Sequence, residues 1–233
     1  MVTIESMDLR KSLIPIRCLA DEKLAVAGFT IKFCKKSVKI SYINQSHTGY
    51  GKYELKTGPI SKSLQNKVIE MTYGQILPIL RMNKSVTFKK EGKDLFITAE
   101  SSTLKLESVV EPFGKEIKFP FTPTVVKTTA RELKPFNLKG LNEFGTCQVN
   151  LNNNPTLSCG EKKSDNFISL KLPKKEGKNV KADFDPTLIK KIIRAVPTKA
   201  DVELGLLGNN KPLRLKIYEG QGAIYLAPRI ERG

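Results

Sequence analysis

The stretch Lys211–Glu231, KPLRLKIYEGQGAIYLAPRIE, predicts how the chain ends. Apolar residues alternate with polar or aromatic ones over 213–218, which is the period of a strand with one buried face. The sequence EGQG at 219–222 predicts a tight turn because glycine reaches positive φ cheaply, and residues 223–226 return as a second strand. Pro228 lacks an amide hydrogen, so pairing should stop near Ala227. The apolar tail after this hairpin needs a cover, and composition favours its own domain over a partner.

The strong positive charge of the chain narrows the classes of partner. Lysine and arginine number 40 against 23 acidic residues among 233, a formal charge of +17. Such an excess favours polyanions, chiefly nucleic acid, but charge alone leaves simple solubility equally open. The length allows one large domain or two of ordinary size. Neither a signal peptide nor an apolar run of the ~20 residues that span a bilayer is evident, so we expect a soluble, intracellular protein.

The cysteines and glycines give no support to an enzyme, a metal site or a cofactor. The four cysteines, 18, 34, 147 and 159, are scattered, form no Cys-x-x-Cys pair and accompany a single histidine, His47. We therefore expect buried, reduced thiols rather than disulfides or zinc ligands. Gly220-x-Gly222 lacks the third glycine of a dinucleotide loop, and no Walker sequence or nucleophile elbow appears. The sequence predicts a protein that is not an enzyme and that uses no cofactor or metal.

The first half of the chain predicts a mixture of short helices and antiparallel strands. Ser6 is expected to cap a helix over 6–20, which Pro15 should kink or shorten. The elements expected after it are strands 24–33, 38–43, 51–55 and 67–71, a helix 72–83 containing Pro78, a hairpin of 86–88 and 95–99, and a strand 103–110 of the type that ends a sheet.

The second half repeats this order. It predicts strand 124–128, helix 129–141 containing Pro135, hairpin 146–151 and 156–159, strand 167–172, a charged loop 174–178, strand 180–184, helix 185–196 capped by Asp185, strand 202–207 and the closing hairpin. Three prolines and a glycine make 111–123 an extended linker. The sequence thus predicts an α+β protein of two similar domains, 1–110 and 124–233, each with antiparallel sheets and two helices.

Basic residues recur on the outer sides of all four expected helices. One such helix indicates only solvation, but four at repeated positions favour a surface that contacts DNA phosphates. Only Tyr73 and Phe136 are aromatic there, too few for a base-stacking platform. The predicted DNA-binding residues are Arg10, Lys11, Arg17, Arg81, Lys84, Arg131, Lys134, Lys139, Lys190, Lys191, Arg194 and Lys199.

Several motifs resemble the sliding clamps of archaea and eukaryotes, the proliferating cell nuclear antigen family. The NQSH of 44–47 and the YEL of 53–55 resemble the family's Asp-Pro-Ser-His loop and the strand after it. Residues 125–127, VVK, resemble the start of the second domain. The KPL of 211–213 and the YLAPRIE of 225–231 resemble the closing hairpin and tail, where the family reads Tyr-Leu-Ala-Pro-Lys-Ile. The tail motif is the most specific of these.

The resemblance implies a ring of three subunits whose helices surround duplex DNA, together with a DNA polymerase, other clamp-binding peptides and a clamp loader as partners. It implies that strand 103–110 pairs with strand 167–172 of the next subunit. It also implies a site for partner peptides at His47, Ile117, Pro212, Tyr225, Ala227 and Pro228.

The chain departs from the family in its charge and its prolines. Family members are usually acidic, whereas this chain is basic throughout and has Lys115 and Lys118 in the linker. These departures fit a divergent clamp, viral or one subunit of a mixed ring. Two further hypotheses stay open, a monomer of clamp fold that grips DNA by charge and a subunit of a heterotrimeric clamp of the checkpoint type.

Overall fold

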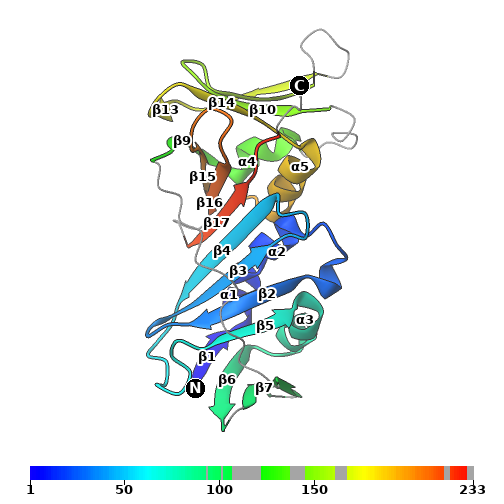
Figure 1. The fold of residues 1–233 in the computed structure, drawn as a ribbon, viewed down its shortest axis with the longest axis vertical. Helices are drawn as coiled ribbons and strands as arrows, with labels where there is room; N and C mark the ends of the chain where they lie inside the picture. The colour runs from blue at the N-terminus through cyan, green and yellow to red at the C-terminus, as the bar shows by residue number, and fades with distance from the viewer. Residues whose placement is uncertain are drawn as a thin grey trace. The chain divides into compact units, whose positions relative to one another are not determined.

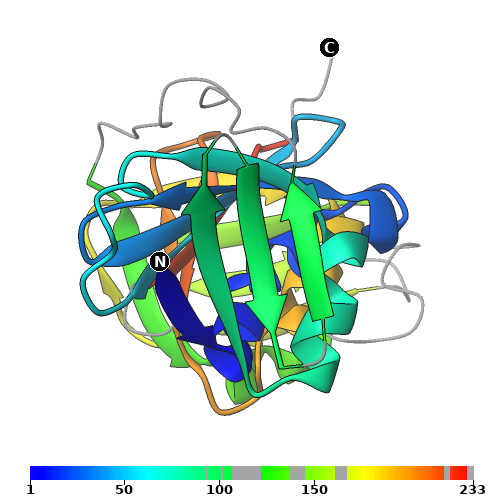
Figure 2. The same ribbon diagram turned by 90° about the horizontal axis from the view of Figure 1, so that it is seen from below.

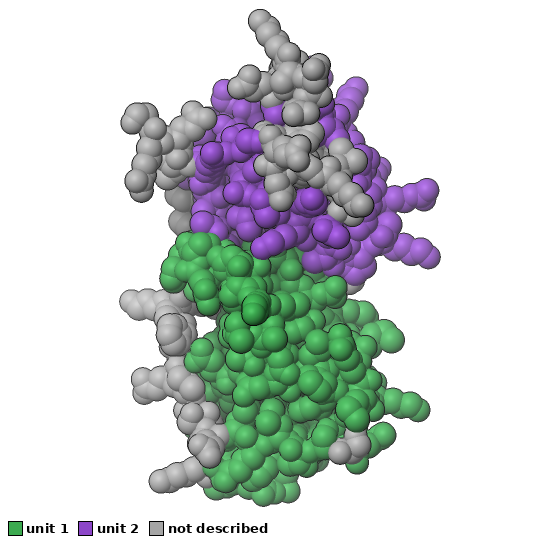
Figure 3. Space-filling model, turned by 90° about the vertical axis from the view of Figure 1, so that its right-hand side faces the viewer, with its two compact units in different colours: residues 1–47, 51–118 green, residues 48–50, 119–233 purple. Residues whose placement is uncertain are grey.

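The chain folds into two compact units. The computed structural model describes residues 1–92, 94–100, 102–106, 122–136, 145–160, 167–217 and 221–229. The first unit comprises residues 1–47 and 51–118, and the second comprises 48–50 and 119–233 (Figures 1 and 3). Most of the expected linker 111–123 lies outside the described residues, as do Ile117 and Lys139, and the expected domain bounds stay a prediction.

The strands of the first unit are hydrogen-bonded in the orders β1-β6-β7-β8 and β4-β3-β2-β5. In Figure 1, α1 lies on the far side of β2 and β3 from the viewer. The elements are β1 (Val2–Glu5), α1 (Ser6–Ser12), α2 (Ile14–Leu19), the 3₁₀ helix η1 (Leu24–Val26), β2 (Gly28–Phe33), β3 (Ser37–Ile43), β4 (Gly49–Lys56), β5 (Val68–Thr72), α3 (Tyr73–Met82), β6 (Ser85–Glu91), β7 (Asp94–Ala99) and β8 (Ser102–Leu106).

The second unit contains the sheets β12-β11-β10-β14 and β13-β9-β15-β16-β17. Its elements are β9 (Thr124–Thr129), α4 (Ala130–Leu133), the 3₁₀ helix η2 (Lys134–Phe136), β10 (Cys147–Leu151), β11 (Thr156–Cys159), β12 (Ile168–Lys171), β13 (Lys175–Glu176), β14 (Val180–Phe184), α5 (Pro186–Ala195), β15 (Asp201–Leu206), β16 (Leu213–Ile217) and β17 (Gly222–Leu226).

Residues 48–50, at the start of β4, belong to the second unit and lie beside β17. The Ala227 amide donates to the Thr48 carbonyl at 2.8 Å. The rings of Tyr50 and Tyr225 stack with centroids 5.9 Å apart. These contacts cover the edge that β17 would otherwise expose.

The two units are copies of one arrangement. The order β1, α1–α2, β2, β3, β4, β5, α3, β6, β7, β8 in the first unit matches β9, α4–η2, β10, β11, β12, β14, α5, β15, β16, β17 in the second. The strand orders of the sheets match as well, with β13 as an addition in the second unit. The prediction of two similar α+β domains is therefore confirmed.

Local differences from the expected elements have physical causes. The helix expected over 6–20 breaks at Leu13 into α1 and α2, and Pro15 lies in the first turn of α2, where its missing amide costs no helical bond. Glu5, not Ser6, is the N-cap of α1, so the expected Ser6 cap is wrong. The buried Ser6 hydroxyl has no hydrogen-bond partner among the described residues. The strand expected from residue 24 begins only at Gly28. The loop expected over 174–178 contains β13, which pairs with β9.

Gly51 lets α2 approach β4 closely. A Cβ atom at this position would lie 2.4 Å from the Pro15 Cβ and 3.3 Å from its Cα, closer than real Cβ contacts. The absence of a side chain therefore sets how closely α2 lies against the sheet.

An aromatic contact lies in the core of the same unit, where the Phe33 and Phe88 rings meet edge to face with centroids 5.4 Å apart.

Two of the four cysteines are not reduced thiols. Cys147 and Cys159 face each other directly across β10 and β11 and form a disulfide, so the expectation of four reduced thiols is wrong for this pair. Both residues are buried, because they are inward-facing members of alternating strands. Cys18 is a buried free thiol, as expected, and Cys34 is free and half-buried. The spacing of 12 residues between Cys147 and Cys159 carries no recognisable disulfide motif, so only strand register brings these two cysteines together.

The apolar tail is covered in part by its own unit, in line with the expected cover. Leu226 is buried, whereas Ala227 is exposed and Pro228 is half-exposed. The Arg229 amide donates to the Asp183 carbonyl at 2.7 Å, so the backbone of the tail is tied to β14. In the part of the chain that the structure describes, no helix is both long and apolar enough to cross a membrane.

Candidate nucleic-acid interface

In the first unit, α1 and α3 bring basic residues from two distant parts of the sequence onto one surface. The Ser6 amide donates to the Lys84 carbonyl at 2.8 Å, which joins the start of α1 to the end of α3. The Arg10 guanidinium donates to the Leu80 carbonyl in the last turn of α3. A cation is favourable at this end of a helix because the last carbonyls lack helical partners and carry partial negative charge.

The predicted basic residues of the first unit differ in how free their charges are. Arg17, Arg81 and Lys84 are exposed. Lys11 forms an ion pair with Asp8, one turn earlier in α1, at 3.2 Å. The Lys11 charge is therefore partly neutralised, and Arg17, Arg81 and Lys84 are the better candidates for contacts with phosphate.

In the second unit, α5 carries the main basic face. Asp185 caps the helix by accepting hydrogen bonds from the Thr187 and Leu188 amides at 2.7 and 3.3 Å. Ile189, Ile192 and Ile193 are buried, while Leu188, which we expected in the buried stripe, is only half-buried. This burial turns the opposite side of the helix outward. The predicted residues on or near this side are Lys190 and Lys191, both half-buried, and the exposed Arg194 and Lys199.

The shorter helix of this unit contributes to the same region. Arg131 in α4 is exposed, and Lys134 in η2 donates its Nζ to the Ile193 carbonyl at 3.2 Å. Thr129 and Glu132 form a reciprocal capping box at the start of α4. The side-chain hydrogen bond from Thr128 and the backbone amide of Thr129 lower the pKa of Glu132, so this carboxylate stays ionised beside the basic face.

The basic positions of the two units are equivalent in the duplicated fold. Arg10 follows Ser6, the first residue of α1, by four residues, as Lys134 follows Ala130. Likewise Leu80 and Ile193, whose carbonyls accept these two side chains, stand at matching positions in α3 and α5. The exposed arginines that directly follow them, Arg81 and Arg194, also match. Sequence reasoning placed basic residues at repeated positions of the helices but missed the bonds of Arg10 and Lys134 to helix carbonyls, because these depend on how separate elements pack.

The outer helix surface is suited to phosphate contacts without base recognition. It presents guanidinium and ammonium groups, and two exposed methionines, Met7 and Met82, lie among them. Tyr73 is buried, so it offers no stacking surface. Among the described residues, no group of three His, Cys, Asp or Glu side chains could hold a metal ion.

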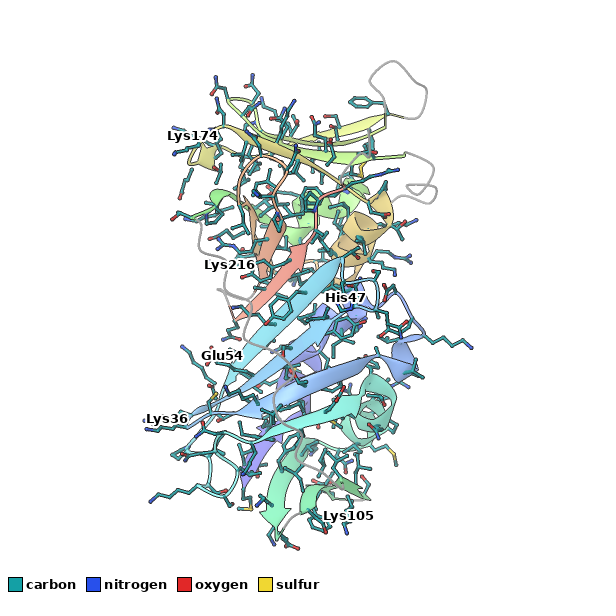
Figure 4. The ribbon with its side chains drawn as sticks, in the orientation of Figure 1. Lys36, His47, Glu54, Lys105, Lys174 and Lys216 are labelled. Atoms are coloured by element: carbon teal, nitrogen blue, oxygen red, sulfur yellow. A yellow bond between two sulfur atoms is a disulfide. The ribbon has the colours of Figure 1, made fainter. Side chains whose placement is uncertain are left out.

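The residues expected to bind partner peptides fall in both units. His47 ends the 44–47 loop, is exposed and has a positive φ of 55° (Figure 4). Asp21 holds this loop, because its carboxylate accepts the Gln45 and Ser46 amides at 3.1 and 3.0 Å. Burial alone would raise the pKa of Asp21, but hydrogen bonds from Ser46 and Glu22 outweigh it and lower the pKa below the usual range.

The remaining expected peptide contacts lie in the second unit. Tyr225 is buried and stacks on Tyr50, and Pro212 and Pro228 are half-exposed. Ala227 and Pro228 follow β17 directly, so they form a short apolar segment that is only partly covered.

The arrangement is that of known sliding clamps. No protein-family model and no curated protein matches the sequence. Among solved structures, the chain resembles the PCNA of A. fulgidus, solved with the C-terminal region of FEN-1, with a TM-score of 0.76, 16% identity and coverage of 100% of this chain and 99% of that one. The chain has the sliding-clamp fold. The PCNA of Thermococcus kodakaraensis gives a TM-score of 0.72 at 16% identity, covering 98% of this chain and 99% of that one.

The bacterial type of sliding clamp is similar as well. The DNA polymerase III beta subunit of Thermotoga maritima gives a TM-score of 0.74 at 12% identity, and the match covers 99% of this chain and 66% of that one. At these identities the likeness concerns the fold alone. The clamp fold therefore explains the duplicated order of elements, while the surface charges belong to this chain.

Proposed function

We propose that the protein is a DNA sliding clamp that acts as a processivity factor for a DNA polymerase and as a docking platform for replication and repair proteins. The observation that carries the proposal is the equivalence of Arg81 with Arg194 and of Arg10 with Lys134 on the outer helices of a duplicated clamp fold. The predicted DNA-binding residues would contact phosphates and leave the bases unread, so the clamp could hold duplex DNA and still slide.

The edges of the sheets support assembly into a closed ring. In the second unit, β17 is covered by the first residues of β4. The strands equivalent to β17 and β4 are β8 and β12, and each ends its own sheet. Pairing of β8 in one copy with β12 in the next would repeat the arrangement already present and would remove both edges. The resemblance of the sequence to homotrimeric clamps favours three copies.

The half-buried residues on these edges fit the same proposal. Leu104 and Leu106 on β8 lie opposite the buried Ile97 and Leu95, yet they are only half-buried themselves. Leu170 on β12 is half-buried opposite the buried Leu157. A neighbouring strand would bury the remaining apolar surface of all three leucines.

We propose the partly covered segment Ala227–Pro228, with His47, Ile117, Pro212 and Tyr225, as the docking site for the peptides of the polymerase and other clients. The loader would be a further partner, and the site of action would be intracellular. In this role the protein is a non-enzymatic scaffold, without a cofactor.

Two alternatives keep the clamp fold but change the mechanism. A monomer could grip DNA by charge alone, which the net charge of +17 favours. A heterotrimeric clamp of the checkpoint type could contain this chain as one subunit.

Retention on circular DNA separates these possibilities. A ring should stay on a nicked circle and leave it after linearisation, and light scattering should give the mass of three chains. A monomer that grips by charge would ignore linearisation but dissociate in high salt. Substituting Lys190, Lys191 and Arg194 with alanine should weaken DNA association in either case. Unchanged association would exclude the basic helix face.

A further inference from the structure

A second group of lysines lies at one end of the second unit, apart from the helices. Lys171 ends β12, Lys174 precedes β13, and Lys178 and Lys181 flank the start of β14. All four are exposed, and Figure 4 shows Lys174 at one end of this unit among other side chains with nitrogen tips. Among the described residues, no ion pair involves any of these four lysines.

The backbone holds this end in a defined arrangement. In the sheet, Lys171 pairs with Thr156, Thr156 with Asn150, and Asn150 with Lys181, so these four residues form one polar row across four strands. Three strand spacings of about 4.8 Å separate the two lysines by about 14 Å. The Lys181 amide also donates to the Asn209 side chain at 2.9 Å, and the Thr124 hydroxyl donates to the Lys178 carbonyl at 2.9 Å.

Acidic side chains do little to neutralise this end. Glu176 is the one acidic residue of the described segment 167–182, and its Oε1 lies 3.5 Å from the Nζ of Lys127 on β9. Asp183, two residues beyond Lys181, accepts a hydrogen bond from the Gln148 amide at 3.0 Å. The end therefore keeps a net positive charge.

The equivalent end of the first unit is basic too. Lys56 ends β4 as Lys171 ends β12, and the segments that follow, 57–67 and 172–179, both lead to the next strand of the same sheet. Exposed Lys35, Lys36 and Lys62 lie at this end. The Thr57 and Ile60 amides bind the Lys36 and Lys35 carbonyls at 2.9 and 3.0 Å, which joins the following segment to the β2–β3 hairpin.

The chemistry of both ends favours the phosphate backbone of duplex DNA over an acidic protein segment. Their lysines stand among hydroxyl and amide groups, Ser61 and Ser63 in one unit and 152–154, NNN, in the other. These groups commonly join lysine in contacts with phosphate oxygens. Among the described residues of the second unit, no large apolar side chain is exposed at this end to anchor a peptide. Neither lysine group includes an aromatic residue, which disfavours single strands that stack on protein.

We propose that each of these two equivalent ends is a phosphate-binding surface for duplex DNA, separate from the helix residues of its own unit. Lys35, Lys36, Lys56 and Lys62 define the surface of the first unit, and Lys171, Lys174, Lys178 and Lys181 define that of the second. Neither surface requires a ring, so the test is independent of the proposed clamp mechanism.

The test measures binding of a labelled 20-base-pair linear duplex by fluorescence anisotropy between 50 and 200 mM salt. The variants are Lys174→Gln with Lys178→Gln and Lys181→Gln, and Lys36→Gln with Lys56→Gln and Lys62→Gln. Each lost phosphate contact lowers the slope of log K against log salt by about 0.9, so each triple variant should lower it by about 2 to 3. Affinity in about 0.1 M salt should fall at least about ten-fold.

The control removes three lysines elsewhere, Lys23→Gln, Lys39→Gln and Lys216→Gln, and should change the slope by less than about 1. A second readout uses the unaltered protein: duplex DNA should protect Lys174 and Lys181 from acetylation, read by mass spectrometry. Triple variants with slopes equal to the control, together with lysines that DNA leaves unprotected, would overturn the proposal. Triple variants that bind a poly-glutamate peptide more weakly but keep their DNA affinity would overturn it as well. Retention on circular DNA by the same variants reports on the clamp mechanism separately.

Discussion

The Nζ of Lys134 lies 3.2 Å from the carbonyl oxygen of Ile193 and so ties the first helical segment of the second domain to the last turn of α5. Arg10 makes the equivalent bond to Leu80 in the first domain. Both residues are also predicted to contact DNA. The structure gives each of them a second role, in joining two helices.

This dual role predicts that Lys134 and Arg194 differ in a measurable way. Lys134→Met removes a hydrogen bond from a charged donor to an uncapped carbonyl, so the free energy of unfolding in urea should fall by about 1 kcal/mol. Arg194→Met, at an exposed position in the last turn of α5, should change stability by less than about 0.5 kcal/mol and mainly weaken DNA binding. If Lys134→Met lowers the free energy of unfolding no more than Arg194→Met does, the hydrogen bond of Lys134 does not stabilise the fold.

The disulfide between Cys147 and Cys159 should stabilise the second domain. Closing a loop of this size restricts the unfolded chain, and the effect is about 3 kcal/mol. Reduction, or Cys147→Ala with Cys159→Ala, should therefore lower the thermal midpoint. The matched control is Cys18→Ala with Cys34→Ala, which keeps the disulfide, so reductant should lower its thermal midpoint by as much as that of the unaltered protein. A midpoint of the unaltered protein that ignores reductant would contradict the disulfide.

The edge strands should control assembly. Leu104→Glu with Leu170→Glu places charges on the half-buried sides of β8 and β12, where a neighbouring strand would otherwise bury leucine. We expect light scattering to give the mass of a single chain. Thr87→Glu, in the interior strand β6 of the sheet that β8 ends, is the control and should leave assembly unchanged. If both variants keep the mass of the unaltered protein, these edges are not the contact between copies.

The 44–47 loop should loosen in acid. The folded state lowers the pKa of Asp21. The ionised Asp21 carboxylate therefore contributes its full stabilisation above about pH 4, the pKa of aspartate in an unfolded chain, and this stabilisation is lost as the pH falls below that value. Amide hydrogen exchange at Gln45 and Ser46 should speed up as pH falls from about 5 to 3, relative to the exchange expected for an unstructured chain. In Asp21→Asn that extra pH dependence should disappear; if it persists, another group holds the loop.

Much of the fold was predictable because its signals are local. Period-two alternation marked the strands of both halves, Asp185 marked the start of α5, and Pro15 predicted the interruption of the first helix. The alignment of one half with the other then predicted two similar domains. Most of the basic residues were found in the same way, since they lie on the polar side of the apolar stripe of a predicted helix.

The rest depends on contacts between residues that are far apart in the chain. Strand register joins Cys147 to Cys159, and packing of η2 against α5 brings Lys134 to Ile193. Strand order places Lys171 and Lys181 in one row of a sheet, although no sequence period links them. The sequence by itself determined which segments become strands and helices and that the chain is strongly basic, because propensity and charge are properties of neighbouring residues. Only the tertiary structure decided which of those charges stand together, because that requires the register and order of strands from separate parts of the chain.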